Sequence, residues 1–288
     1  MILTHYPRDY HEQFLSAHIT LPDFLQLPYV RPSFFKYSVR IVNFYNKDGR
    51  EKSHSGNLLF LRLKSSEPDA HCYTELEFDN GKRYSRCLTQ RSTATGQQEN
   101  IYDVKAVLPA HQEKGWLKVY FASTADIMTE ENKPFQKWRY ALTMCIPVYQ
   151  QQQQDINSSA QADQTISSSF EFVQLYHLPL KHLSQEYYIQ QPQCYYLYPL
   201  QTYQFSIKCN HSTIRHTTIH PSHHKLALKS PTGKLRKLMY YPQDQTYDGN
   251  ITISETGKWT LVCFISANHH DCSNGTSYVV AQWSCNTI

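Results

Sequence analysis

Short runs in which apolar and polar residues alternate recur along this chain of 288 residues, and they are rich in Val, Ile, Tyr, Phe and Trp. This period of two is typical of half-buried β-strands, and no stretch sustains the period of an amphipathic helix. Two of the runs open at a glycine, 115–122 and 257–265, and each is followed by another strand-like run, 138–145 and 278–285. The sequence therefore predicts two copies of one all-β module.

A further strand and turn precede the glycine run in each copy. In the first copy 73–78 leads into Asn80-Gly81, and in the second 225–228 leads into Pro231-Thr232-Gly233. Both turn sequences are hairpin signals. Short strands at this spacing are typical of immunoglobulin-like sandwiches. The predicted fold class is all-β, with two tandem immunoglobulin-like β-sandwiches behind a short helical or extended N-terminal lead-in.

The repeat divides the chain into four segments. We expect a lead-in over 1–35, a first sandwich over 36–149, a linker over 150–168 and a second sandwich over 169–288. The linker is rich in Gln and Ser and has too few apolar residues to offset the entropy of ordering it. We interpret it as flexible, which would leave the orientation of the modules open. A glutamine-rich interaction tract is the alternative.

Charge and hydropathy limit the classes of partner that we expect for this chain. The net charge is +4, and the basic residues are scattered apart from one cluster, so we expect no nucleic acid partner. That cluster consists of Lys229, Lys234, Arg236 and Lys237. No apolar stretch is long enough for a membrane span, and the first residues lack the apolar core of a signal peptide. We therefore predict a cytoplasmic protein without a membrane span.

The eight cysteines are spread over the chain without a Cys-x-x-Cys motif. We predict free thiols, many of them in strands, instead of a disulfide framework. Glycosylation sequons at Asn210, Asn250 and Asn274 are interpreted as chance matches because no secretion signal is seen. A secreted adhesive tandem, with disulfides or glycans, is the alternative.

The lead-in is unusually apolar for its length. Ser16 or Thr20 would cap a short helix, with Pro22 in its first turn and Phe24, Leu25 and Leu27 facing a core. Such a segment needs a surface to pack against, and the first module offers only part of one. We expect it to be the remnant that follows an upstream domain.

A family resemblance rests on the lead-in and on the two glycine-aromatic hairpins together. The lead-in motifs are His5-Tyr6-Pro7, Asp9, Gln13-Phe14-Leu15, 19–24 and Pro32-Ser33-Phe34-Phe35. With these motifs the chain resembles the C-terminal region of kyphoscoliosis peptidase and of hillarin-type transglutaminase-like proteins. The resemblance implies a non-catalytic unit for protein binding or scaffolding, associated with cytoskeletal partners.

The same resemblance places catalysis elsewhere. Transglutaminase-like enzymes of this family use a Cys-His-Asp set upstream of the lead-in, and only four residues precede His5. We predict that the chain is not an enzyme; the alternative is that it belongs to an enzyme whose catalytic domain lies upstream. Cys72 with His111 and Asp103, or Cys209 with His211, are the remaining candidates. They fall in strands or turns, which lack the helix N-terminus that would lower a thiol pKa.

Histidines gather in the second module and are the candidates for a metal site. They are His211, His216, His220, His223 and His224, followed later by His269-His270-Asp271-Cys272. Imidazole and thiolate bind zinc, but the spacing lacks the repeated pairs of a structural zinc site. We therefore predict no metal and no cofactor, and we interpret these residues as a solvated loop.

Paired tyrosines mark candidate strands in the second half: 187–188, 195–196 and 240–241. On a strand, one member of each pair faces the core and the other faces solvent. The exposed tyrosines could belong to a protein-binding surface, where aromatic residues are enriched. Exposed strand edges offer a second route, because a partner can add a strand to them.

Overall fold

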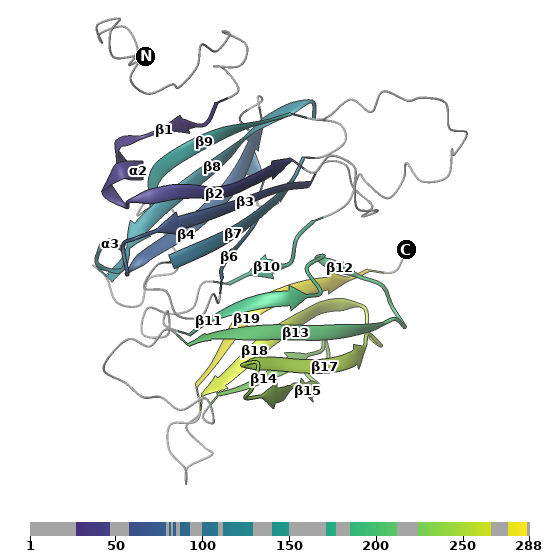
Figure 1. The fold of residues 1–288 in the computed structure, drawn as a ribbon. Helices are drawn as coiled ribbons and strands as arrows, with labels where there is room; N and C mark the ends of the chain where they lie inside the picture. Colours follow the sequence, from purple (N-terminus) through teal and green to yellow (C-terminus); the bar gives the residue numbers. More distant parts are fainter. Residues whose placement is uncertain are drawn as a thin grey trace, which may run out of the picture.

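The computed structural model describes residues 27–46, 58–78, 81, 83–84, 87–92, 100–108, 112–128, 140–149, 171–176, 185–211, 224–265 and 276–286. Within these ranges nearly all regular structure is β, in four sheets that pack as two sandwiches (Figure 1). The predicted fold class is therefore confirmed. The four-segment division of the chain stays a prediction, and the Gln- and Ser-rich segment 150–168 lies outside the described residues.

The first sandwich consists of a five-stranded sheet with the order β1-β9-β8-β4-β5 and a four-stranded sheet with the order β2-β3-β7-β6. Neighbouring strands are antiparallel. The elements are β1 (Tyr29–Val30), α2 (Pro32–Lys36), β2 (Val39–Asn46), β3 (Leu58–Ser65), β4 (Ala70–Phe78), β5 (Arg83–Tyr84), β6 (Cys87–Arg91), β7 (Asn100–Val107), β8 (Lys114–Ser123), α3 (Thr124–Met128) and β9 (Ala141–Tyr149).

The second sandwich repeats this plan. One sheet has the order β10-β19-β18-β14-β15, with β12 beside β19, and the facing sheet has the order β11-β13-β17-β16. The elements are β10 (Gln174–Leu175), β11 (Gln185–Gln191), β12 (Tyr196–Leu197), β13 (Thr202–His211), β14 (His224–Lys229), β15 (Leu235–Lys237), β16 (Met239–Tyr241), β17 (Thr246–Thr252), β18 (Gly257–Ile265) and β19 (Thr276–Cys285).

The internal repeat is visible in the sheets. β4-β8-β9 in the first module corresponds to β14-β18-β19 in the second, and each central pair carries a bulge at the same distance from its opening glycine. The two glycines act differently, which the sequence did not predict. Gly257 has a φ of +118°, whereas a Cβ at Gly115 would lie 3.1 Å from the carbonyl oxygen of Glu77. Gly115 therefore permits close packing instead of a left-handed turn.

Each module has its own core, produced by alternating side chains. In β3 buried and half-buried residues alternate, so Leu59, Leu61 and Leu63 enter the first core. Phe205, Trp259 and Trp283 are fully buried in the second core, where the rings of Phe205 and Trp283 meet edge to face. Burial of each such side chain contributes roughly 1.5–3 kcal/mol to the free energy of unfolding, so these core residues carry much of the stability of the two modules.

The two modules contact each other directly. Leu88 and Val107 of the first module belong to the core cluster that contains Ile189 of the second. The side-chain amide of Gln90 accepts a hydrogen bond from the Ile189 N–H at 2.7 Å and donates one to its carbonyl oxygen at 3.2 Å. Lys105 Nζ donates to Gln193 Oε1 at 2.7 Å. We expected the linker to leave the orientation of the modules open; instead, side chains join β6 and β7 to β11.

Candidate functional site

The residues proposed as metal ligands give no assembled site in the described part of the chain. His211 ends β13 and His224 begins β14, but their side chains lie outside what the structure describes. His216, His220, His223 and 269–272 lie wholly outside it. Within the described residues no group of three His, Cys, Asp or Glu side chains is placed to hold a metal ion. The metal candidates therefore stay untested.

The candidate catalytic pairs do not come together where they are described. Cys72 packs against the first core, whereas Asp103 on β7 accepts hydrogen bonds from Arg62 (2.6 Å) and from Tyr188 of the second module (3.1 Å). His111 lies outside the described residues. Burial raises the pKa of the Cys209 thiol to about 12, which opposes formation of a nucleophilic thiolate.

The seven cysteines in the described part of the chain are free thiols, and five others follow the trend of Cys209. Burial raises the thiol pKa of each of these: Cys87, Cys145, Cys194, Cys263 and Cys285. Such thiols behave as small apolar side chains.

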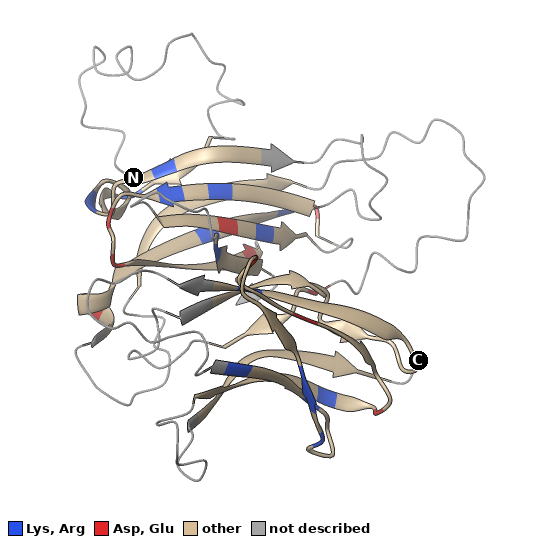
Figure 2. Cartoon of the chain, turned by 60° about the horizontal axis from the view of Figure 1, so that its bottom comes forward, with Lys and Arg blue, Asp and Glu red and all other residues tan. Residues whose placement is uncertain are grey.

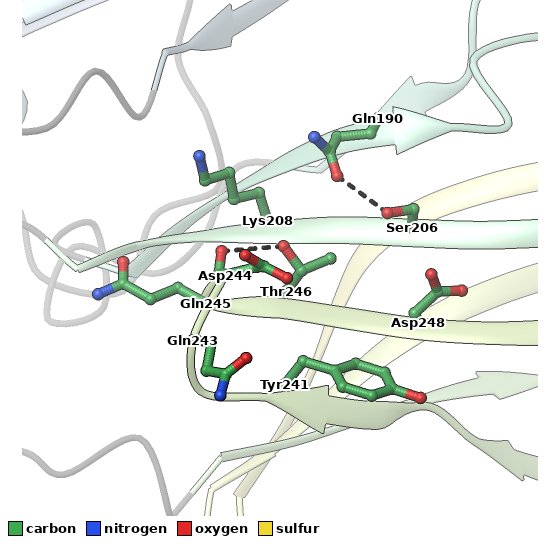
Figure 3. Close-up of a pocket in the computed structure, with 9 residues that line it drawn as sticks. All are labelled: Gln190, Ser206, Lys208, Tyr241, Gln243, Asp244, Gln245, Thr246 and Asp248. Carbon is green, nitrogen blue, oxygen red and sulfur yellow. Dashed lines mark hydrogen bonds between the residues drawn. The ribbon is translucent and has the colours of Figure 1, made fainter.

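A polar hollow of about 550 Å³ lies on the outer face of the β11-β13-β17-β16 sheet (Figure 3). Ser206 donates a hydrogen bond to Gln190 across its upper wall at 2.9 Å. The turn between β16 and β17 forms the opposite wall, where Thr246 donates to the Asp244 carbonyl oxygen at 3.0 Å. The hollow mixes amides, carboxylates and one lysine, Lys208, so no single ligand charge is favoured.

A different surface gathers apolar side chains. Seven of the sixteen large apolar side chains exposed in the described residues lie between Leu27 and Phe44. We call this surface the amino-terminal flank; it comprises Leu27, Tyr29, Val30, Phe35, Ile41, Val42 and Phe44. Figure 1 shows its elements β1, α2 and β2 next to one another at one side of the first module. A concentration of this kind marks an interaction surface more often than scattered single residues do.

Local sequence explains how the flank is built. β1 pairs with β9, and the Arg31 N–H donates to the Thr143 carbonyl oxygen at 2.9 Å. Pro32 then starts α2, where its fixed φ suits the first turn of a helix. Ser33 Oγ donates to the Leu142 carbonyl oxygen at 2.7 Å. These bonds hold α2 against β9, and they leave Phe35 pointing outward with 71% of its surface exposed.

β2 carries the other half of the flank. Its register against β3 shifts between Ile41 and Asn43, so Val42 is the extra residue of a bulge. Ile41, Val42 and Phe44 are 38%, 46% and 45% exposed. β2 pairs with β3 along one side only and forms an edge of its sheet. The flank therefore combines apolar side chains with a free strand edge.

The flank is basic, as the blue segments near α2 and β2 in Figure 2 show. Residues 27–46 contain Arg31, Lys36 and Arg40 and no Asp or Glu. Lys36 Nζ lies 3.7 Å from Asp126 Oδ2, which also accepts a hydrogen bond from buried Tyr37 at 3.0 Å. Hydrogen bonds from Ser123 hold the pKa of the Asp126 carboxyl below its usual value. Burial raises the pKa of Tyr37.

The sequence contained a partial signal for this surface. Adjacent apolar residues at Ile41-Val42 break the alternation of β2, and residues 27–46 contain no Asp or Glu. The flank was nevertheless missed, because an edge strand cannot be told from a central strand by periodicity alone. Phe24 and Leu25 of the predicted helix lie outside the described residues. Leu27, which was expected to face a core, is instead 42% exposed and belongs to the flank.

Comparison with known proteins shows what the chain is similar to. Residues 180–285 match the family model described as the CYK3 C-terminal Ig-like domain. The second module is thus of the immunoglobulin-like class. The chain is also 24% identical over 277 residues to cytokinesis protein 3 of Schizosaccharomyces pombe and 24% identical over 302 aligned residues to cytokinesis protein 3 of Saccharomyces cerevisiae. These alignments cover 90% and 99% of the chain but only 27% and 31% of the relatives.

The resemblance to kyphoscoliosis peptidase and hillarin-type transglutaminase-like proteins was wrong, because the matches are to cytokinesis protein 3 and its Ig-like domain. The hairpin motif misled because a glycine followed by alternating aromatic residues suits any antiparallel hairpin that packs closely, as Gly115 does. The lead-in motifs before residue 27 lie outside the described residues. Neither described helix, at five residues each, is long enough to cross a membrane.

Proposed function

We propose that this chain is a non-catalytic protein-binding unit of a protein that acts in cytokinesis, working in the cytoplasm with partners of the division machinery. The match of 180–285 to an Ig-like domain and the names of the two relatives support the process. Sandwiches of this class commonly bind other proteins through a face or an edge.

The observation that carries protein binding is the amino-terminal flank. Its apolar side chains lie on both β1 and β2, which are edges of the two different sheets of one sandwich. Exposed apolar residues beside strand edges carry a cost in aggregation, so a binding role is the simplest reason for this concentration. The buried thiols with raised pKa values favour binding over thiol catalysis.

The test is the localisation of the chain in dividing cells. The full chain, fused to a fluorescent protein, would be expressed in S. pombe as wild type and as the triple variant Ile41→Thr, Val42→Thr, Phe44→Thr. We expect wild type to be enriched at the division plane and the variant to lose that enrichment. The matched control is Leu235→Thr, Met239→Thr, Tyr241→Thr, which removes exposed apolar residues from the second module and should leave localisation unchanged.

Two results would count against the proposal. One is a wild-type chain spread evenly through dividing cells. The other is a flank variant that stays enriched at the division plane as strongly as wild type does. Circular dichroism of the purified variants would show whether each still folds, since all three residues are exposed and Thr suits a strand.

A further inference from the structure

We propose that β2 accepts an acidic, extended segment of a partner protein as an added strand of the β2-β3-β7-β6 sheet. This inference rests on the proposed protein-binding function and specifies its mode and its partner. It follows from three properties of β2: an uncovered edge, apolar side chains at the rim of the core, and basic surroundings.

The edges of the four sheets differ in how they are protected. β1, β5 and β10 have two residues each, and β15 and β16 have three. Very short edge strands are a common way to prevent unwanted pairing. β6 and β11 cover each other at the module contact, where Gln90 occupies both backbone groups of Ile189. β2 has eight residues and, in the described part of the chain, no strand paired to its outer side.

The apolar side chains of β2 lie where an added strand would bury them. Ile41 is the cross-strand partner of Leu63, and Phe44 is the partner of Leu61. Because cross-strand partners point to the same face, Ile41 and Phe44 point toward the core side, where both leucines are fully buried. Yet 38% of Ile41 and 45% of Phe44 remain exposed. These two side chains therefore lie at the open rim of the sandwich, which a neighbouring strand would close.

The charges around the edge select the partner. Arg31 and Arg40 are exposed and have no carboxylate partner among the described residues, whereas Lys36 already faces Asp126. Arg40 lies across from Lys64 on β3, which adds a second cation beside the edge. A segment with apolar residues toward the core and Asp or Glu residues on the opposite face would match both features.

A second copy of this chain fits the edge less well. Pairing β2 with β2 of another copy would bring the two sets of Arg31, Lys36 and Arg40 together without any acidic residue from 27–46. Like charges at an interface disfavour association. The acidic segment is therefore the occupant we assign, and self-association is an outcome that the experiment distinguishes.

The probe is a fluorescent peptide of alternating Val and Glu, titrated with the purified full chain by anisotropy. Two control peptides carry Lys in place of Glu, or N-methyl groups on the backbone nitrogens of one edge. We expect binding of the acidic peptide that weakens as NaCl rises from about 0.05 M to about 0.5 M. Both control peptides should bind about tenfold more weakly or not at all.

Variants of the chain would test whether the acidic peptide binds at β2. Arg40→Glu, which changes an exposed residue and leaves the core intact, should weaken the acidic peptide about tenfold. Val42→Pro should weaken it, because proline lacks a backbone N–H and is poorly accommodated in a strand that pairs on both sides. Lys237→Glu on β15 is the matched control and should bind as wild type does. Should Val42→Pro fail to fold, Arg40→Glu and the N-methylated peptide still decide the question.

Several results would overturn the inference without touching the proposed function. They are equal binding of the N-methylated peptide, equal loss in Lys237→Glu, or flank-dependent localisation by a chain that binds none of the peptides. Dimerisation that Arg40→Glu strengthens, measured by sedimentation, would indicate a second copy instead. Binding to phosphatidylserine vesicles that exceeds binding to the acidic peptide would indicate a membrane surface. A wild-type chain that neither concentrates at the division plane nor binds the acidic peptide would reject the proposed function as well.

Discussion

Replacing Gln90 by Ala probes the contact between the modules most directly. Gln90 is 4% exposed, and its amide bonds both backbone groups of Ile189, which is fully buried. In the variant the Ile189 carbonyl oxygen keeps a hydrogen bond from Gln193 at 2.8 Å, but the N–H loses its partner. A buried unpaired donor costs about 1–3 kcal/mol, and the lost methylene adds a further contribution of about 0.8 kcal/mol.

The expected result is a loss of about 2–4 kcal/mol from the free energy of unfolding of the second module. Urea unfolding followed by tryptophan fluorescence would measure it, because Trp259 and Trp283 are buried in that module. Gln204→Ala is the matched control. Gln204 is exposed and bonds Asp248 at 2.9 Å on the outer face, so its loss should change stability by less than about 0.5 kcal/mol.

The reasoning would be refuted if Gln90→Ala unfolded at the same urea concentration as wild type. Gln90→Met separates the two contributions, since it keeps the volume of the side chain and removes only the amide. We expect Gln90→Met to lose about 1–3 kcal/mol, which is the cost of the unpaired donor alone. A stability equal to wild type for this variant would show that water replaces the amide at the contact.

Three other predictions concern single sites. The pKa of Asp126 is lowered in the folded chain, so its carboxylate should stabilise the fold at pH values above its ordinary pKa of 3.8, and this contribution should be lost as pH falls through the folded pKa. Asp126→Asn should therefore lose less thermal stability than wild type on acidification. An identical loss would contradict this assignment. With a thiol pKa of about 12, Cys209 should react with a disulfide reagent at pH 8 far more slowly than in urea, whereas fast labelling of the native chain would refute its burial. Gly115→Ala should destabilise the first module by about 1–3 kcal/mol in urea unfolding, because the new Cβ would lie 3.1 Å from Glu77 O and Phe78 Cδ1; unchanged stability would mean that β4 yields easily.

The sequence predicted the strands that form the cores, because alternation over 115–122 and 257–265 reflects burial of one face of a strand. It also located the turn at Pro231-Thr232-Gly233, where the Gly233 N–H donates to Ser230 O at 2.9 Å. Tyr187 is buried as expected for one member of a tyrosine pair, but Tyr188 bonds Asp103 of the other module instead of facing solvent. Contacts between modules depend on residues far apart in the chain, and local periodicity carries no information about them.

The structure of the flank also depends on strand pairing that local periodicity does not reveal. Pro32 signals a helix start only when the strand before it is known, and β1 is a strand only because β9 lies beside it. The bulge at Val42 depends on its pairing with β3. The apolar residues of the candidate site could be read from the sequence, whereas their exposure follows from the position of β2 at the edge of its sheet.

The contact made by Gln90 has a consequence for how the chain can vary. If side chains of β6, β7 and β11 set the spacing between the two sandwiches, the length of the glutamine tract at 150–154 does not. Lengthening a loop adds only about 0.6 kcal/mol of closure entropy for each doubling. Glutamine repeats of different length could therefore be inserted there, and the distance from the flank to the second module would stay the same. The tandem should act as one rigid arm whose reach is independent of the segment that joins its halves.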